Sequence, residues 1–308
     1  MSNQKLLIHI GYPKAASTWL QNTLFNDEKT GFISPWGALS SEGLNMLALV
    51  NSFRFSAQLT RKRFEPGLQE AARRDLVPVI SHESLSGNQM QAKYWGKEVA
   101  DRIYAVFPEA RVLIIIREQK SIILSSYKQY IRSGQSKTIQ RFIGVDVERP
   151  GFKPICRLDY FEYDLLITYY QNIFGSHNVL VLPFELLKKK PQYFWEKIKI
   201  FAGSKGTFNP CKTAEYTSLK AGTVACLQQL NRFIVTPDFS GSKMPFTYYL
   251  IDKLSKVVEL ITPADFHQNI ETNWRQVIAD YIGESFSESN QITSKLIDMN
   301  LADFGYDC

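Results

Sequence analysis

The sequence predicts a three-layer α/β fold, with a mainly parallel sheet flanked by helices. Four short segments rich in Val, Ile and Leu are spaced along the chain, which is typical of strands buried on both faces of a parallel sheet. Segments with the apolar spacing of amphipathic helices lie between and after them. We expect the strands near Lys5 to Tyr12, Val77 to Ser81, Arg111 to Ile116 and Asn178 to Leu182.

The first strand runs into the sequence GYPKAAST, Gly11 to Thr18, where a new helix begins at the two hydroxyl residues. Such a strand-loop-helix joint can hold a phosphate-like anion with the free N–H groups of the first helical turn, a lysine and hydroxyl groups. In a Walker loop the lysine directly precedes the hydroxyl residue. Here Lys14 lies three positions before Ser17. The pattern therefore predicts a P-loop-like site for a different nucleotide.

This loop resembles the 5′-phosphosulfate loop of sulfotransferases that use 3′-phosphoadenosine 5′-phosphosulfate (PAPS), which reads roughly Y-P-K-S-G-T-T-W. Ala15 replaces the usual Ser and loses a hydroxyl, and Ala16 replaces the usual Gly. Since an alanine disfavours the left-handed region, we expect a negative φ at Ala16. In the family the tryptophan stacks on adenine, which implies the same role for Trp19. The resemblance assigns cofactor binding to Gly11, Tyr12, Pro13, Lys14, Ala15, Ala16, Ser17, Thr18 and Trp19.

A second motif follows the strand at Arg111 to Ile116. Sulfotransferases bind the 3′-phosphate of PAPS with an Arg at such a strand end and a Ser eight residues later, and Arg117 and Ser125 have this spacing. The planar guanidinium can hold two phosphate oxygens at once. Glu118-Gln119 replaces the family's Asn/Asp-Pro, so the turn lacks its proline. We expect an amphipathic helix over Glu118 to Arg132.

A third motif, Ser81-His82-Glu83-Ser84, follows the strand at Val77 to Ser81. Sulfuryl transfer needs a general base near the attacking atom, and either His82 or Glu83 could serve. The family members that act on small phenols use a His at this position, whereas glycan-modifying members use a Glu. We favour Glu83 and keep His82 as the alternative, which includes a purely structural, hydrogen-bonded histidine.

The resemblance implies a sulfotransferase that moves a sulfuryl group from PAPS to a hydroxyl or amine and releases 3′,5′-bisphosphoadenosine (PAP). Lys14 would stabilise the charge that grows on the leaving oxygen. The motifs are closest to bacterial and glycan-type members, so the expected acceptor is a carbohydrate, such as a surface glycan. The alternatives are a small hydroxylated molecule or lipid as acceptor, a P-loop kinase or NTPase, and a silent nucleotide-binding protein, which would not need Glu83.

Composition agrees with this interpretation. The 308 residues include 44% hydrophobic residues, enough for one sizeable core, and the net charge of +6 suits an anionic ligand. Because no zinc-finger, RNA-recognition or helix-turn-helix pattern accompanies the charge, we expect no nucleic-acid function. The four histidines are scattered and the four cysteines lack C-x-x-C spacing. We therefore predict no metal and reduced cysteines.

Localisation is predicted from segments that the sequence lacks. The chain shows no run of eighteen or more apolar residues and no cleavable apolar leader, so we expect a protein of the cytoplasm without an integral membrane segment. Eukaryotic glycan sulfotransferases are usually membrane-anchored, which favours a bacterial source. The sequence gives no indication of the oligomeric state.

The remainder of the chain predicts further helices and one more strand. We expect a single domain over 1–308, with a cofactor-binding core over about 1–203 and a helical acceptor or lid portion over about 204–308. Ser285 to Tyr306 resembles the ending of many bacterial sulfotransferases, with a Ser-Asn pair and a final Gly-Tyr. The other expected elements are helices at Tyr160 to Phe174, Pro191 to Gly203, Ser218 to Phe233 and Tyr248 to Leu260, a strand over His177 to Leu187 with Glu185 in a loop, and a polar loop at Asp238 to Lys243.

Overall fold

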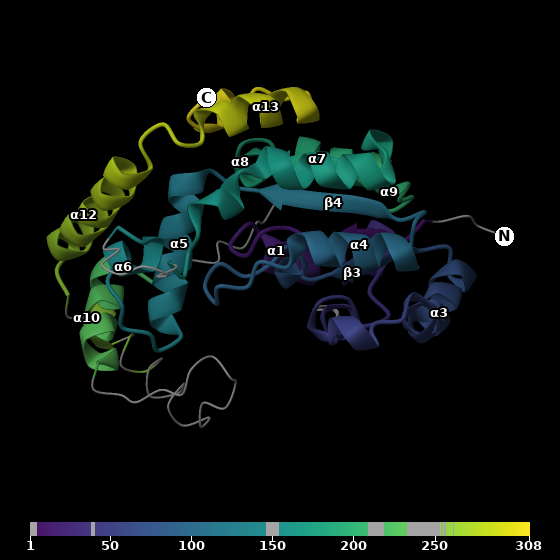
Figure 1. Cartoon of the computed structure of the whole chain (residues 1–308), viewed down its shortest axis with the longest axis horizontal. Helices are drawn as coiled ribbons and strands as arrows, with labels where there is room; N and C mark the ends of the chain where they lie inside the picture. Colours follow the sequence, from purple (N-terminus) through teal and green to yellow (C-terminus); the bar gives the residue numbers. More distant parts are fainter. Residues whose placement is uncertain are drawn as a thin grey trace.

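The computed structural model describes residues 5–37, 41–145, 154–208, 219–232, 253, 255, 257–260 and 262–308. In these residues a five-stranded sheet has the order β2-β3-β1-β4-β5, and every neighbouring pair is parallel (Figure 1). The strands are β1 (Leu7–His9), β2 (Phe32–Ile33), β3 (Val77–Ser81), β4 (Arg111–Ile116) and β5 (Val179–Pro183). The predicted α/β fold with a parallel sheet is confirmed.

Two strands differ from the prediction. β2 was not predicted, since two residues are too short to show an alternating pattern. β1 ends at His9 rather than Tyr12, because the chain leaves β3 there and continues along β4 alone. The N–H groups of Ile10 and Tyr12 donate to the carbonyls of Leu113 and Ile115 at 3.0 and 3.2 Å. The backbone at the start of the loop is therefore hydrogen-bonded to β4 and no longer to β3.

Helices flank the sheet. α3, α4 and α7 follow one another in a row along it, where α3 packs on β3 and α7 on β4 and β5 (Figure 1). α1 and α9 meet through Trp19 and Phe194 and form the other layer. The helices of these layers are α1 (Ser17–Trp19), α3 (Ala57–Arg73), α4 (Gly96–Val106), α7 (Tyr163–Phe174), α8 (Phe184–Lys189) and α9 (Pro191–Ala202). The remaining helices with described bounds are α2 (Ser41–Leu44), α5 (Gln119–Arg132), α6 (Ile139–Ile143), α10 (Ala221–Asn231), α12 (Ala264–Ile282) and α13 (Ser287–Ile297).

Local sequence explains where several helices begin and end. The Ser56 side chain accepts a hydrogen bond from the Leu59 N–H and so caps α3. Glu118 caps α5 with both carboxylate oxygens, which accept from the N–H groups of Lys120 and Ser121 at 2.8 Å. The family has an Asn/Asp-Pro pair at this position. Here the Glu118 carboxylate caps the helix instead and takes over the role of the proline in starting it.

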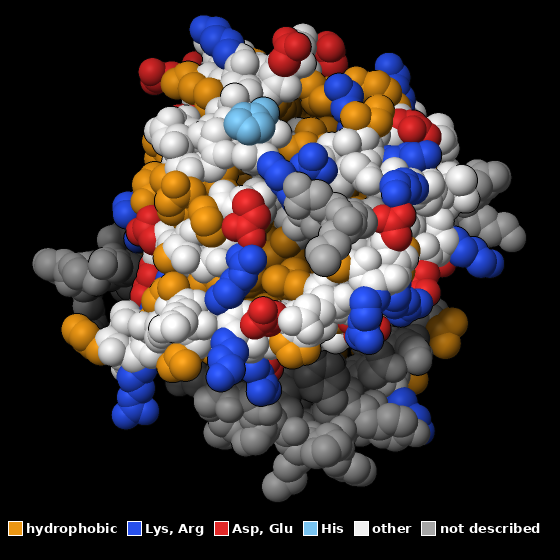
Figure 2. Space-filling view, turned by 90° about the vertical axis from the view of Figure 1, so that its right-hand side faces the viewer, with side chains coloured by type: hydrophobic (Ala, Val, Ile, Leu, Met, Phe, Trp, Pro, Cys, Tyr) orange, Lys and Arg blue, Asp and Glu red, His pale blue; other side chains and the backbone are white. Residues whose placement is uncertain are grey.

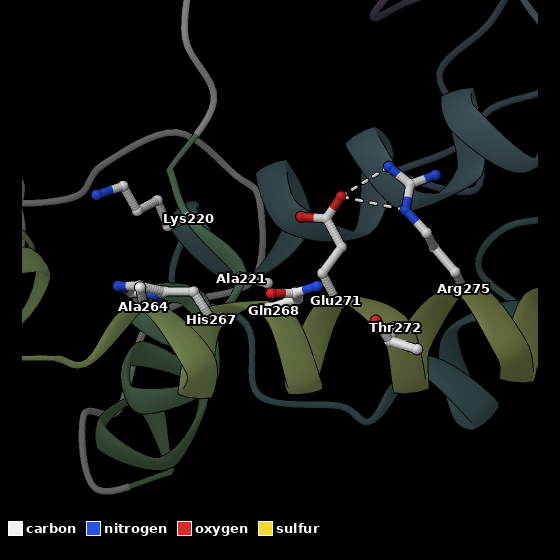
Figure 3. A pocket seen from close by; sticks show the side chains of 8 residues that line it. All are labelled: Lys220, Ala221, Ala264, His267, Gln268, Glu271, Thr272 and Arg275. Atoms are coloured by element: carbon white, nitrogen blue, oxygen red, sulfur yellow. Dashed lines mark hydrogen bonds and ion pairs between the residues drawn. The ribbon is translucent and has the colours of Figure 1, made fainter.

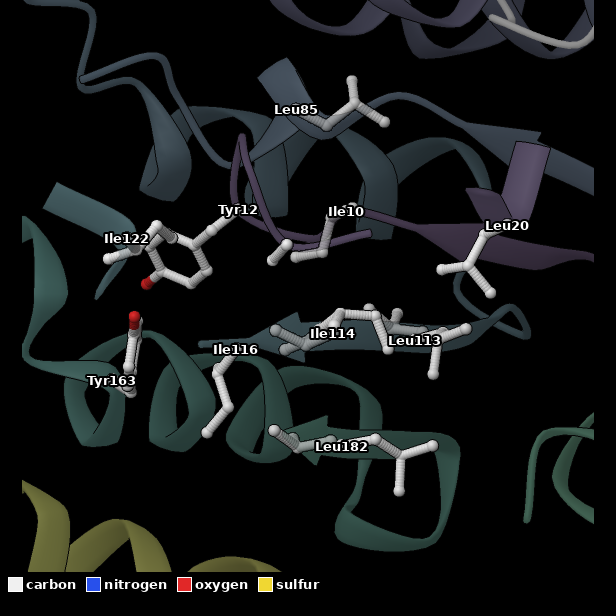
Figure 4. Packing of buried hydrophobic residues seen from close by; sticks show 14 of the residues in the cluster. Ile10, Tyr12, Leu20, Leu85, Leu113, Ile114, Ile116, Ile122, Tyr163 and Leu182 are labelled. Carbon is white, nitrogen blue, oxygen red and sulfur yellow. The ribbon is translucent and has the colours of Figure 1, made fainter. Parts of the chain in front are cut away.

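The core lies between the sheet and its flanking helices. β4 is buried along its length after Arg111, as its uninterrupted run of aliphatic residues predicted. Figure 4 shows Ile10, Tyr12 and Leu20, from the loop and the helical segment that follow β1, among side chains of β4 and β5. The Tyr12 and Tyr163 rings meet edge to face with 4.8 Å between centroids. The loop after β1 is therefore anchored in the core rather than laid over it.

The C-terminal third splits into two parts. α10 and α12 pack against α5, while α13 returns to pack on α7 (Figure 1). Four predicted helices are confirmed with small shifts, as α5, α7, α9 and α10, but α3, α4, α12 and α13 were not predicted. The placement of Glu185 in a loop was wrong, because α8 begins directly after β5. The predicted polar loop at Asp238 to Lys243 and most of the helix at Tyr248 to Leu260 lie outside the described residues.

Charge and hydropathy on the described surface are mixed. Figure 2 shows the right-hand side of Figure 1, the end opposite α10 and α12, where basic and acidic side chains intermingle. Among the described residues no helix is long and apolar enough to cross a bilayer. Cys156, Cys226 and Cys308 are free thiols, and Cys211 lies outside the described residues.

Candidate active site

The three predicted motifs meet at the carboxyl edge of the sheet. β1 lies between β3 and β4 with His9 opposite both Ser81 and Leu113. Because the strands are parallel, the segments that follow them emerge at the same edge, which is where open α/β sheets bind ligands. The loop at Gly11 to Thr18, the His82-Glu83 turn and Arg117 are thereby brought together.

The loop after β1 has an unusual backbone. Lys14 and Ala16 both adopt positive φ angles, of 76° and 64°. The expectation of a negative φ at Ala16 was wrong: the loop keeps the left-handed turn that glycine usually makes, at the cost of crowding the alanine Cβ. Strain of this kind persists only where the surroundings fix the backbone.

Two buried side chains below the loop fix it. The Gln89 amide nitrogen donates to the Pro13 carbonyl at 3.2 Å and to the Ser126 hydroxyl of α5 at 2.7 Å. His9 lies under Gly11, where a Cβ would come within 2.7 Å of the imidazole Nε2. Gly11 is thus needed for close approach, and Gln89 joins the loop to the helix that carries Ser125.

Arg117 contacts the loop directly. Its Nη1 donates to the carbonyl oxygen of Lys14 at 2.8 Å, and its guanidinium lies 5.0 Å above the Phe184 ring centroid. The Tyr163 hydroxyl donates to the Arg117 carbonyl at 2.5 Å. The Arg117 Nε is buried and has no partner among the described residues. The two predicted anion-binding motifs therefore form one site, with a guanidinium donor still to be satisfied.

The hydroxyl residues of the two motifs differ in burial. Ser17 is 5% exposed, and its Oγ has no hydrogen-bond partner among the described residues. Thr18 is exposed, and Ser125 on α5 is half-buried. A buried hydroxyl without a partner is uncommon in proteins. Together with the free N–H groups of the first turn of α1, Ser17 Oγ is a second donor that an anion could satisfy.

Positive charge gathers at Lys14. Burial, and then the guanidinium groups of Arg117 and Arg132, lower the pKa of the Lys14 ammonium, while the Glu83 carboxylate opposes them. Arg132, at the end of α5, was not predicted as a site residue. A polyanion would relieve the repulsion among these three cations.

Glu83 begins a 3₁₀ turn after β3 and is oriented by Gln21. The Gln21 amide nitrogen donates to the Ser81 carbonyl at 3.2 Å and to Glu83 Oε2 at 3.4 Å. Gln21 is fully buried, in the helical segment that continues α1. The half-buried Glu83 carboxylate, which acts electrostatically on Lys14, can therefore accept a proton close to the loop.

His82 is used differently. Its Nδ1 accepts a hydrogen bond from the Ser84 N–H at 3.1 Å and caps the turn. Burial lowers the pKa of His82, so the ring is neutral at pH 7 and carries its proton on Nε2. The lone pair that a base would need is already engaged. This geometry favours Glu83 as the base, and which of the two acts remains a prediction.

Two of the loop's aromatic residues serve packing. Trp19 is 5% exposed and meets Phe194 and Phe208 edge to face. Tyr12 lies between Tyr160 and Tyr163. Stacking of Trp19 on adenine stays a prediction, and its burial argues for a role in the core instead.

Gln21 and Gln89 are the contacts that sequence reasoning missed. Gln21 lies one helical turn after Ser17, a position the motif does not include, and Gln89 lies in an irregular segment. A glutamine has no signature of its own in a single sequence. Its role becomes visible through burial and through the carbonyl and carboxylate groups that it contacts.

A hollow of about 440 Å³ lies elsewhere, between α10 and the first half of α12 (Figure 3). Figure 3 shows Glu271 paired with Arg275 along α12, while Lys220, the residue before α10, points away from this pair. None of the predicted site residues lines it. Among the described residues no group of three His, Cys, Asp or Glu side chains could hold a metal ion.

A solved structure supports the fold. No protein-family model and no curated protein sequence matches the chain. The fold is similar to the crystal structure of a sulfotransferase from Alicyclobacillus acidocaldarius, with a TM-score of 0.57 at 15% identity, over 97% of this chain and 98% of that chain. The chain therefore has the fold of a sulfotransferase.

Two further structures are similar at lower TM-scores. They are the sulfotransferase domain from the curacin biosynthetic pathway, with a TM-score of 0.42, 15% identity and coverage of 92% and 98%, and that of the Synechococcus PCC 7002 olefin synthase, with a TM-score of 0.41, 13% identity and coverage of 84% and 96%.

Proposed function

We propose that this chain is a PAPS-dependent sulfotransferase that modifies a hydroxyl, or an amine, of a carbohydrate acceptor. The observation that carries the proposal is the hydrogen bond from Arg117 Nη1 to the Lys14 carbonyl, at 2.8 Å. It joins a loop suited to a 5′-phosphosulfate and an arginine suited to a 3′-phosphate in one site. A Walker-type kinase or NTPase needs only the first of these.

The residues fit such a ligand. Two buried donors without partners among the described residues, Ser17 Oγ and Arg117 Nε, belong to the two motifs. Lys14, Ser17 and Thr18 would hold the 5′-phosphosulfate, and Arg117 and Ser125 the 3′-phosphate. When bound, PAPS supplies the sulfuryl group and a phosphate leaving group.

The chain's own residues would then have separate roles in the transfer. Lys14 provides a positive charge within the loop, where it stabilises negative charge better than water does because it need not reorient. Glu83 takes the proton of the acceptor at a carboxylate oxygen, held by Gln21. A sugar hydroxyl is less acidic than a phenol, so a dedicated carboxylate base supports a carbohydrate acceptor.

Two finer statements are also proposals. The division of a single domain into a cofactor-binding core over about 1–203 and an acceptor-binding portion over about 204–308 is supported by the packing of α10 and α12 on α5, the helix of Ser125. The cytoplasmic location, the bacterial source and the absence of a metal requirement remain predictions from the sequence.

The test is transfer of labelled sulfate from PAPS to a panel of glycans, lipids and phenols. We expect label on a carbohydrate, and transfer slower by on the order of 10²-fold when Lys14 is replaced by alanine. Label on a phenol or lipid alone would move the acceptor to small hydroxylated molecules. No label on any acceptor, together with no binding of PAP, would contradict the proposed function.

A further inference from the structure

The turn that carries Arg117 is held by a buried carboxylate from another element. Glu185, at the start of α8, accepts a hydrogen bond from the Glu118 N–H at 3.2 Å through Oε1. Its other oxygen, Oε2, accepts from the Tyr306 hydroxyl at 3.1 Å. Tyr306 is 4% exposed and is the third residue from the C-terminus. Glu185 thus links the C-terminal segment to the residue after Arg117.

A second connection runs from α13 to the same turn. The side-chain amides of Gln119 and Asn290 are buried and form two hydrogen bonds, of 2.7 and 3.3 Å. Asn290 also donates to the Asp307 carbonyl at 2.7 Å, and the Lys120 ammonium lies 2.6 Å from the Asp307 carboxylate. Three consecutive residues after Arg117 therefore contact the C-terminal segment, directly or through Glu185.

These contacts fix both polar groups of the peptide bond that joins Arg117 to Glu118. The Tyr163 hydroxyl holds the carbonyl of Arg117, and Glu185 holds the N–H of the next residue. Phe184, the neighbour of Glu185, lies beneath the guanidinium. A guanidinium fork grips a phosphate well only when its plane is correctly oriented. The orientation of this fork is therefore set by side chains far away in the sequence.

We propose that Asn290 and Tyr306, with Glu185, are positioning residues that hold Arg117 for a 3′-phosphate, so that the C-terminal segment sets the preference for nucleotides phosphorylated at the 3′ position. This inference rests on the proposed function and concerns residues that the transfer chemistry does not use. It gives a physical role to the Asn of the Ser-Asn pair and to the Tyr of the final Gly-Tyr, which stand out in the sequence.

The test compares PAP with 5′-AMP, which lacks the 3′-phosphate, by calorimetry on the full chain. In Tyr306→Phe, which removes the hydroxyl alone, we expect the dissociation constant for PAP to rise about threefold to tenfold and that for 5′-AMP to stay unchanged. The ratio of the 5′-AMP constant to the PAP constant should therefore fall by the same factor. Glu185→Gln should act in the same direction. General loss of stability would not change this ratio, because both nucleotides bind the folded protein.

The matched control is Ser289→Ala. Ser289 on α13 donates to the Asp164 carboxylate of α7, so this variant also loses a hydroxyl-carboxylate contact of the C-terminal segment, but one that does not reach the turn. Its ratio should equal that of the unaltered protein. An unchanged ratio in Tyr306→Phe, or an equal fall in Ser289→Ala, would overturn the inference. If the unaltered protein itself shows no preference for PAP, the proposed function fails with it.

Discussion

The loop after β1 and the turn after β4 hold their anion-facing side chains in different ways. The loop is fixed mainly by its own backbone, with left-handed residues at Lys14 and Ala16 and one buried amide, Gln89, beneath it. The turn at Arg117 has an ordinary backbone and is fixed by side chains from α7, α8 and α13. A loop that is fixed by its own backbone can be recognised from a sequence motif, whereas a turn that is fixed by side chains from distant parts of the chain cannot.

The two regions also differ in what they can contribute. The loop side carries Lys14 and, across from it, Glu83 with Gln21, which are the groups suited to charge stabilisation and proton removal. The turn side carries a guanidinium fork, and the two carboxylates near it, Glu118 and Glu185, are engaged by backbone N–H groups. We therefore expect substitutions on the loop side to change the rate of transfer, and those on the turn side to change the choice of nucleotide.

The largest effect is expected at Glu83. Glu83→Gln should lower the rate of transfer to a carbohydrate by about 10²- to 10⁴-fold, since it removes the proton acceptor, and should leave PAP affinity nearly intact. His82→Asn is the matched variant: an asparagine can still cap the turn, so most activity should remain. Steady-state rates and calorimetry on both variants measure this. An inactive His82→Asn beside an active Glu83→Gln would instead indicate a histidine base and a small hydroxylated acceptor.

Lys14 should come next. If its ammonium stabilises the leaving oxygen, Lys14→Ala should lower kcat by on the order of 10²-fold, beyond any change in KM for PAPS. Lys97→Ala, which removes an exposed lysine on α4, serves as the control. A Lys14→Ala variant with a raised KM and an unchanged kcat would assign this residue to ground-state binding and would blur the distinction between the two regions.

Arg117 tests the other side. Arg117→Lys keeps the charge but loses the planar fork, so PAP affinity should fall about tenfold to hundredfold while 5′-AMP affinity changes little. Arg73→Lys makes the same exchange at the exposed end of α3, which precedes β3 and so lies at the opposite edge of the sheet, and it should change neither affinity. Equal losses for PAP and 5′-AMP in Arg117→Lys would show that Arg117 supports the loop rather than a 3′-phosphate.

His9 gives the loop side its own pH dependence. Burial, and then the charge of His82, lower the pKa of His9 to about 3 from 6.5, so the folded protein keeps this imidazole neutral. The unfolded chain takes up a proton near pH 6.5, so stability is lost as the pH falls from 6.5 toward 3. Between pH 6.5 and about 4.5 the unaltered protein should lose roughly 2 kcal/mol more than His9→Gln.

Urea unfolding of both proteins at the two pH values checks this. Parallel losses of the free energy of unfolding would mean that the fold tolerates a charged His9 beneath Gly11, and that the loop is less rigidly supported than its contacts indicate.

The smallest effect is expected from the strained backbone. Ala16→Gly should raise the free energy of unfolding by about 0.5–1 kcal/mol, because glycine relieves the left-handed strain at a small entropic cost. Ala15→Gly, the same exchange one residue earlier, should destabilise the protein, since Ala15 is fully buried and has no positive φ. Thermal unfolding distinguishes the two. A stabilised Ala15→Gly, or a destabilised Ala16→Gly, would contradict this account of the loop.

The sequence predicted the fold better than it predicted the environment of the site. Long aliphatic runs identified four of the five described strands, whereas β2 has two residues and shows no period. The motif spacing predicted that Lys14, Glu83 and Arg117 would gather at one edge. It could not reveal that Ala16 takes the glycine conformation, because tertiary contacts can hold a residue against its preference.

The contacts that hold the turn at Arg117 could also not be predicted from a single sequence. Glu185 and Tyr306 lie far from Arg117 along the chain, and no local period or motif relates them. The prediction placed Glu185 in a loop, whereas a helix starts at Phe184 and turns the carboxylate toward the Glu118 N–H. Such roles follow from burial and from partners, which require the fold.

The central claim is that the two regions form one site for a nucleotide phosphorylated at both its 5′ and 3′ positions. Calorimetric titration of the unaltered protein with PAP and with 5′-AMP tests it most directly. Because the 3′-phosphate adds a charge-assisted contact with Arg117, we predict that PAP binds about tenfold to hundredfold more tightly than 5′-AMP. Equal affinity for the two nucleotides would contradict the claim.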